Sequence, residues 1–354
     1  MKHYTYLLIL ILSIGFTSCI SDIPYKGGLT EPKLYVTANV DLTIDSAFIF
    51  VGQSSFFLTT PRVTDCFSDA KVTITHRGNT QTLRYHEPNM ENGTPWLGYD
   101  GEYNFKPQDR RYDGNEFMRP VIGYYLWQIP NNIEAGDTLY FEASKDGFDP
   151  VRSPLIVPQP HHLTLLEKSI RDDGEKLKMK LQISCPKPNV ETTAIYMEFH
   201  TKIKYATEEY NQTTKEYEIV YDTSEYSNFS SIDKIFVTPD DIFEFETPGD
   251  YWSPVTFLSN SLTSYPYTIN IEVKHSDKNL WAAIDTIPTE YLGTTITFRN
   301  YSYEKYRYEI ARYNASDAED NPFAEPVVTY TNIEGGFGYF SVTHSQTVVV
   351  TDDN

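Results

Sequence analysis

An apolar residue alternates with a polar one throughout Leu177-Lys178-Met179-Lys180-Leu181-Gln182-Ile183. In an extended strand, successive side chains point to opposite faces, so this alternation gives one packed face and one solvated face. The stretch therefore predicts a half-buried β-strand with water on one side.

Short segments of the same character lie on both sides of this stretch. They are rich in β-branched and aromatic residues and are separated by turn-forming residues, which is typical of antiparallel β-sandwiches. In one of them, Ala70, Val72 and Ile74 alternate with polar neighbours. We therefore expect a mainly β protein, with further strands at 34–40, 47–51, 70–75, 139–143, 193–200 and 267–273.

The length of the chain, 354 residues, suggests two domains. We expect the boundary at Val157-Pro158-Gln159-Pro160, because proline cannot donate a hydrogen bond to a sheet and stiffens a junction. The first domain, 33–158, resembles prealbumin- or immunoglobulin-like sandwiches in its strands and in its turns at Gly136 and Gly147. The second domain, 161–349, resembles a fibronectin type III-like sandwich.

A long polar stretch at about 207–231 reads as an insertion in the second domain. Within it, Tyr217, Ile219 and Tyr221 occupy every second position and indicate a hairpin. Loops of this length in a compact domain are often functional.

One short helix is expected near the C-terminal end, within 300–313. Four side chains recur at steps of three and four and so share one helical face: Tyr303, Tyr306, Ile310 and Tyr313. Ser302 or Asn300 is expected to cap the helix. A tyrosine stripe at this spacing is usually buried, so we expect it to pack on the second sandwich; a stacking platform for a glycan is the functional alternative.

The N-terminal segment has the three-part build of an export signal. A basic head at Lys2 precedes an apolar run at 6–16, too short to span a bilayer comfortably, and small residues then lead to Cys19. This ending resembles a bacterial lipobox, although an ordinary signal peptide with a nearby cysteine is the alternative. We expect a signal peptide at 1–18, a lipid on Cys19 and a flexible tether at 19–32.

The formal net charge of −20 bears on the choice of partners. So acidic a chain is unsuited to a phosphate backbone, and we expect no nucleic-acid partner. Adsorption to anionic lipid is disfavoured for the same reason, so membrane attachment is expected through acyl chains on Cys19. The expected location is the outer membrane, on either its periplasmic or its cell-surface face.

No motif in the sequence points to catalysis, a cofactor or a metal, and we expect none of the three. Adjacent residues of an extended segment point to opposite sides, which argues against His161-His162 as a metal pair. The carboxylate pair of a glycosidase has no fixed sequence spacing, so a hydrolase is only the least favoured hypothesis. Cys66 and Cys185 are free to pair in an oxidising compartment, but separate burial is favoured because they fall in different expected domains.

Irregular aromatic segments are the candidate binding residues. Tyr and Trp bury a large area while losing few rotamers, which suits recognition. The candidates are Trp96, Tyr99 and Tyr103 in the first domain and Trp252 in the second. A loop folded over the end of a sandwich is the structural alternative for each.

A family resemblance lies beyond the expected helix, in Asn321-Pro322-Phe323-Ala324-Glu325-Pro326-Val327 and the glycine-rich stretch at 330–340. With the lipobox and the strands, this pattern resembles the Bacteroidetes lipoprotein family of domain of unknown function 4249. Its members are commonly encoded beside TonB-dependent transporters. The resemblance implies a non-catalytic accessory role in nutrient uptake; the alternative is a surface lipoprotein that captures a peptide, glycan or metal chelate independently of a transporter.

Overall fold

The computed structural model describes residues 31–54, 66–87, 96–97, 103–104, 123–172, 174–185, 192–236, 249–252, 255–276, 287–319 and 330–352. The chain divides into two compact units, Met1–Glu31 and Pro32–Asn354. The expected signal peptide, Cys19 and most of the tether lie outside the described residues, so the following concerns the second unit. Within its described part, no helix has the length and apolarity needed to cross a membrane.

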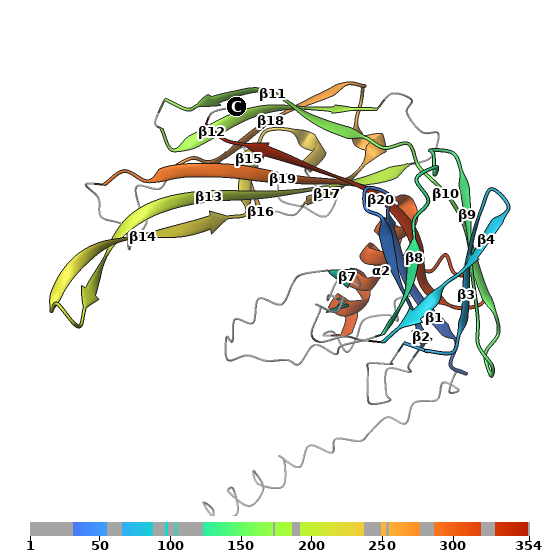
Figure 1. Cartoon of the computed structure of the whole chain (residues 1–354). Helices are drawn as coiled ribbons and strands as arrows, with labels where there is room; N and C mark the ends of the chain where they lie inside the picture. The colour runs from blue at the N-terminus through green and yellow to red at the C-terminus, as the bar shows by residue number, and fades with distance from the viewer. Residues whose placement is uncertain are drawn as a thin grey trace, which may run out of the picture. The chain divides into compact units, whose positions relative to one another are not determined.

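A sheet of nine strands runs through this unit (Figure 1). Eight strands follow one another in the order β14-β13-β19-β20-β1-β2-β8-β5, and β17 pairs with β13 beside them. Neighbouring strands are antiparallel except β1 and β20, which are parallel. The strands are β1 (Leu34–Asp41), β2 (Ser46–Gln53), β5 (Arg84–His86), β8 (Tyr124–Gln128), β13 (Thr193–Asn211), β14 (Glu216–Tyr226), β17 (Val255–Leu258), β19 (Glu290–Ser302) and β20 (Phe337–Val350).

Two smaller antiparallel sheets complete the layers, one in the order β10-β9-β3-β4 and one in the order β11-β12-β18-β15-β16. Their strands are β3 (Lys71–His76), β4 (Asn79–Thr82), β9 (Thr138–Ser144), β10 (Val151–Ile156), β11 (His162–Ile170), β12 (Lys176–Ser184), β15 (Asn228–Ser231), β16 (Gly249–Trp252) and β18 (Tyr267–Lys274). A separate pair joins β6 (Trp96–Leu97) to β7 (Tyr103–Asn104), and two 3-10 turns, η1 (Lys234–Phe236) and η2 (Ser259–Ser261), follow β15 and β17.

Each smaller sheet shares a hydrophobic core with a different part of the long sheet. In the first core, Val36 of β1 and Phe340 of β20 pack with Phe141 of β9. In the second, Phe298 of β19 packs with Ile271 of β18. The outcome is mainly β, with layered antiparallel sheets, as expected.

The C-terminal strand β20 contributes to both cores. Phe340 and Val342, near its start, belong to the first core, whereas Val350, at its end, belongs to the second. The two layered halves therefore share one continuous sheet, and the last strand in the sequence is the seam between them.

The strands expected from alternation are present. The stretch that alternates at 177–183 lies in β12, where Leu177, Met179, Leu181 and Ile183 are all buried. The hairpin indicated by the polar insertion is also present as β13 and β14. Cys66 and Cys185 are both buried and no disulfide joins them.

The expected helix is present as α2 (Tyr303–Glu319), but its expected packed face is wrong. Tyr303 and Ile310 are 38% and 44% exposed, whereas Lys305 and Tyr308 are 0% and 9% exposed. Tyr308 packs on Tyr339 of β20, at 4.6 Å between ring centres, and its hydroxyl meets that of Tyr35. Spacing identifies residues that share a helical face. Contact with Tyr35 and Tyr339 on the sheet determines which face is buried.

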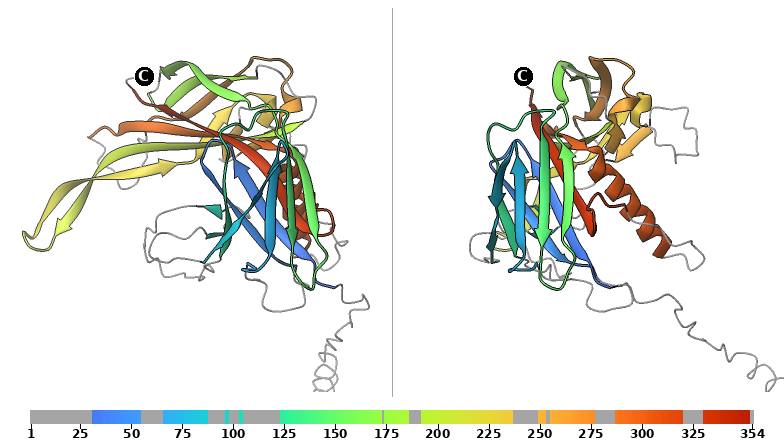
Figure 2. Two further views of the ribbon diagram at one scale, coloured as in Figure 1. Left: turned by 45° about the vertical axis from the view of Figure 1, so that its right-hand side comes forward. Right: turned by 90° about the vertical axis from the view of Figure 1, so that its right-hand side faces the viewer.

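Both residues expected as caps belong to β19, and Ser302 directly precedes the first residue of α2. The Ser302 hydroxyl accepts a hydrogen bond from the Val342 N–H, and the Asn300 amide donates to Thr193 Oγ1. The helix lies on the face of the long sheet opposite the first core (Figure 2), since Tyr339 and Phe340 alternate along β20.

Gly338 lets β20 approach β1 closely. Its φ is +95°, and a Cβ built there would lie 1.8 Å from the Val36 carbonyl oxygen. That distance is far below any real contact between a carbon and an oxygen. The parallel pairing of Val36 with Gly338 therefore requires glycine for both conformation and space.

We predict that Gly338→Ala destabilises the protein by more than about 3 kcal/mol, because the added methyl group forces the paired strands β1 and β20 apart. Gly78→Ala is the matched control: its φ is +81°, but a Cβ there meets nothing within 4 Å. The control should cost only the left-handed conformation, about 1–2 kcal/mol. Urea unfolding measures both; equal losses would show that the close approach is unimportant.

Candidate functional site

Four exposed large side chains with apolar surface gather at the end of the β13–β14 hairpin, which we call the arm (205–211 with 216–222). Pairing between β13 and β19 ends at Lys204 and Glu290. Beyond it, β13 pairs only with β14 in the described part of the chain, from Tyr205↔Asp222 to Asn211↔Glu216. Figures 1 and 2 show the arm extending past the neighbouring strands.

Local hydrogen bonds close the tip of the arm. Asn211 Oδ1 accepts from the backbone N–H groups of Thr213 and Thr214, at 2.8 and 3.3 Å. The N–H of Lys215, whose φ is +60°, donates to the Asn211 carbonyl at 2.8 Å. The Asn211 side chain thus satisfies the turn in the manner typical of Asx residues, and it sets the register of the whole arm.

One face of the arm is aromatic. Tyr217, Ile219 and Tyr221 alternate along β14 and are 71%, 55% and 62% exposed. Tyr210 lies opposite Tyr217, with 5.3 Å between ring centres, and the Lys204 ammonium lies 4.9 Å from the Tyr221 ring centre. Single exposed apolar residues are common, but a contiguous row of them often marks an interaction surface.

The other face of the arm is acidic. Register places Glu209 opposite Glu218, Asn211 opposite Glu216 and Tyr205 opposite Asp222. Burial raises the pKa of the Tyr205 hydroxyl, and the charge of Asp222 raises it further. Because like charges on paired strands repel, this face disfavours stacking of two arms through it.

The structure brings some of the predicted binding residues together. Trp96 and Tyr103 lie on the paired strands β6 and β7, where Leu97 is opposite Tyr103. Trp252 lies on β16, in a different sheet, opposite Asn228. The side chains of these three residues, together with Tyr99 and Cys19, lie outside what the structure describes.

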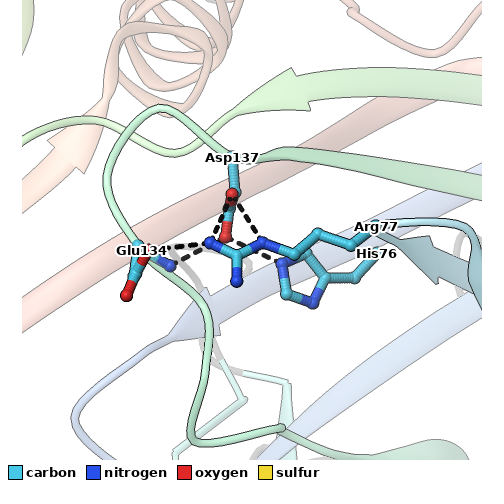
Figure 3. A network of polar contacts seen from close by, with 4 residues as sticks. All are labelled: His76, Arg77, Glu134 and Asp137. Carbon is cyan, nitrogen blue, oxygen red and sulfur yellow. Dashed lines mark hydrogen bonds and ion pairs between the residues drawn. The ribbon is translucent and has the colours of Figure 1, made fainter.

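A compact polar network joins two turns of the first half (Figure 3). Asp137 accepts hydrogen bonds from the Glu134 N–H at 2.9 Å and from Arg77 Nε at 3.0 Å, and its other contact is His76 Nε2 at 2.8 Å. Arg77 also reaches the Glu134 carboxylate at 2.8 Å. The backbone N–H of Glu134 and then the contacts with His76 and Arg77 lower the pKa of Asp137 to about 2.

The Asp137 network has a structural role. It ties the β3–β4 turn, where Arg77 has a φ of +48°, to the turn that precedes β9. Its carboxylate is saturated by donors and remains ionised at any pH above about 2. These contacts suit a fixed ion pair rather than a proton-transferring group.

We predict that Asp137→Asn costs about 1–3 kcal/mol of unfolding free energy at pH 7, because His76, Arg77 and the Glu134 N–H lose their charged partner. The stability that the carboxylate contributes is present above its unfolded pKa of 3.8 and is lost as pH falls toward about 2. The variant should therefore approach the wild type in acid. Urea unfolding at pH 7 and pH 3 checks this; the exposed Asp146→Asn should change stability by under about 0.5 kcal/mol.

The two histidines considered for metal binding do point apart: His161 is 3% exposed and His162 is exposed. His161 Nε2 lies 2.7 Å from the Tyr265 hydroxyl, and burial lowers the pKa of His161, with His162 lowering it further. Burial also lowers the pKa of His344 on β20. Among the described residues, no group of three His, Cys, Asp or Glu is placed to hold a metal ion.

The buried neutral His161 predicts a loss of stability in mild acid. Its folded pKa is below the ordinary 6.5, so the unfolded chain takes up the proton first as pH falls below about 6.5. The stability cost approaches about 1.4 kcal/mol per pH unit for one such group. Urea unfolding between pH 7.5 and 5.5 should show a flatter dependence for His161→Gln; the exposed control His162→Gln should keep the wild-type slope.

Comparison of the chain with protein-family models and with curated protein sequences finds no match. In the sequence, the alternation of Tyr217, Ile219 and Tyr221 with other residues indicated the hairpin that forms the arm. Its exposure had no sequence signal, because alternating aromatic residues are equally typical of a packed strand.

Proposed function

We propose that this chain is a lipid-anchored outer-membrane protein that binds a partner rather than catalysing a reaction, and that it serves a TonB-dependent transporter as an accessory in nutrient uptake. The observation that carries the proposal is the arm. It presents Tyr217, Ile219 and Tyr221 to solvent on a two-stranded ribbon, and these large side chains are suited to packing against another protein.

The arm has the energetics of a docking element. Full burial of one large apolar side chain contributes about 1.5–3 kcal/mol, and tyrosine is enriched among the residues that dominate interfaces. Ring contact between Tyr210 and Tyr217 and the cation above Tyr221 restrict these side chains before binding. Such restriction reduces the entropy lost on association.

Two features of the sequence support the membrane part of the proposal. The pattern that ends at Cys19 supports an acyl anchor, and the resemblance at 321–327 and 330–340 supports work beside an outer-membrane transporter. A tethered protein meets a membrane partner at high effective concentration, so an interface of modest area suffices. The acidic face of the arm favours a partner whose neighbouring surface is basic.

We predict that the tagged full-length chain, purified from gently solubilised outer membranes, brings down a TonB-dependent transporter. The triple variant Tyr217→Ser, Ile219→Ser, Tyr221→Ser should lose at least about 90% of it, because the contact face becomes polar. The Cys19→Ala variant should be absent from the membrane fraction, because it lacks the residue that carries the lipid. Mass spectrometry of co-eluting proteins is the measurement.

The matched control is Tyr140→Ser with Ile170→Ser, since these side chains are 51% and 51% exposed but lie off the arm. It should recover the transporter as the wild type does. Equal recovery by the arm variant would show that another surface docks. Recovery of the lipidated wild type alone would overturn the accessory function and favour capture of a ligand without a transporter.

A further inference from the structure

A cleft of about 530 Å³ lies where the first half of the long sheet meets the second. Its borders come from the end of β10, the start of β13, the β17–η2 connection and the first turn of α2. Ligand pockets are typically about 300–1,000 Å³ and often lie at such junctions. The cleft shares no residue with the arm; its Thr193 lies at the opposite end of β13 from the arm.

One wall of the cleft is aromatic. Tyr303, at the start of α2, lines the cleft and is 38% exposed. Its ring lies 6.1 Å from that of Tyr306, at an interplanar angle of 17°, and the Arg307 guanidinium lies 5.9 Å from its centre. Arg307 in turn lies 4.2 Å from the Tyr330 ring centre. These contacts hold Tyr303 in place, with part of its surface open to water.

The other walls combine aliphatic side chains with polar ones. Ile156, 48% exposed, and Leu258 supply the aliphatic surface, while Thr192, Asn260 and Glu304 bring a hydroxyl, an amide and a carboxylate. A side-chain amide both donates and accepts hydrogen bonds, and a carboxylate accepts them. This set is suited to a ligand with adjacent hydroxyl groups.

The floor of the cleft is fixed by bonds within the protein. Thr193 and Ser302 are 1% and 3% exposed. The Thr193 hydroxyl accepts from the Asn300 amide at 3.0 Å, and the Ser302 hydroxyl accepts from the Val342 N–H at 3.3 Å. Because both hydroxyls are engaged, the floor keeps its shape when a ligand enters.

The charge of the lining narrows the ligand class. The described residues that line the cleft include no Lys, Arg or His and one carboxylate, Glu304. A phosphate, sulfate or carboxylate ligand would meet the like charge of Glu304, the one charged residue among the described residues of the lining. A single carboxylate is also too few ligands for a calcium ion. A neutral ligand with apolar faces and several hydroxyls fits, and a sugar ring has this composition.

We propose that this cleft binds a neutral saccharide, with one sugar face on the Tyr303 ring and its hydroxyls on Asn260 and Glu304. The inference does not depend on the arm or on the membrane anchor. It assigns a role to Tyr303, which is exposed instead of packed on the sheet.

The test is a glycan array that carries neutral oligosaccharides beside their sialylated, sulfated and phosphorylated counterparts, probed with the full-length chain in detergent. We expect neutral glycans to bind and acidic counterparts to bind at least about tenfold more weakly. Isothermal titration with the best neutral glycan should then show a loss of at least about tenfold for Tyr303→Ala and for Asn260→Ala. Tyr303→Phe should stay within about threefold, since it keeps the ring.

Ile310→Ala is the matched control, because Ile310 is 44% exposed on the same helix and does not line the cleft. It should leave affinity unchanged. Circular dichroism checks that each variant is folded, and Asn260→Ala stands in if Tyr303→Ala is not. Failure of every neutral glycan to bind, preference for acidic glycans, or wild-type affinity in folded Tyr303→Ala and Asn260→Ala would each overturn the proposal.

Discussion

The parallel pairing of β1 with β20 is the constraint on which the rest of the structure depends. It joins Tyr35 to Phe337 and Asp41 to Thr343, residues that lie about 300 positions apart in the sequence. Beyond Thr343, the same strand pairs with β19 as far as Val350. Without the last strand, the first core lacks Phe340 and Val342. Pairing two strands this far apart in the sequence costs chain entropy, and the burial of both cores offsets that cost. Glycine at 338 makes the closure sterically accessible.

The helix α2 covers this seam on the other face of the sheet. Tyr308 contacts Tyr339 of β20 and Tyr35 of β1, so one residue touches both seam strands. Beside it, the Lys305 ammonium is buried 4.4 Å from the Tyr301 ring centre and 3.6 Å from the Glu309 carboxylate. Burial raises the pKa of Tyr301 well above its ordinary value, and Glu309 raises it further. A buried cation held between a ring and a carboxylate fixes the rotation of the helix, and that rotation turns Tyr303 outward.

Both proposed binding surfaces follow from the shared sheet. The arm exists because β13 and β14 continue after β19 has ended, which leaves a ribbon without a further strand beside it in the described residues. The cleft exists because the chain changes from the first core to the second between Val157 and Leu163, close to the start of α2. Two separate sandwiches on a flexible linker would hold no such fixed junction.

The sequence by itself determined the local elements. Alternation located β12 and the β13–β14 hairpin, and spacing of three and four located α2, because these periods follow from the geometry of one strand or one helix. Only the tertiary structure decided that β20 joins β1, that Lys305 and Tyr308 are buried in place of Tyr303 and Ile310, and that the arm's tyrosines meet water. A period defines which residues share a face; whether that face is buried depends on what packs against it, and a packing partner can lie far away in the sequence, as Tyr35 does from Tyr308.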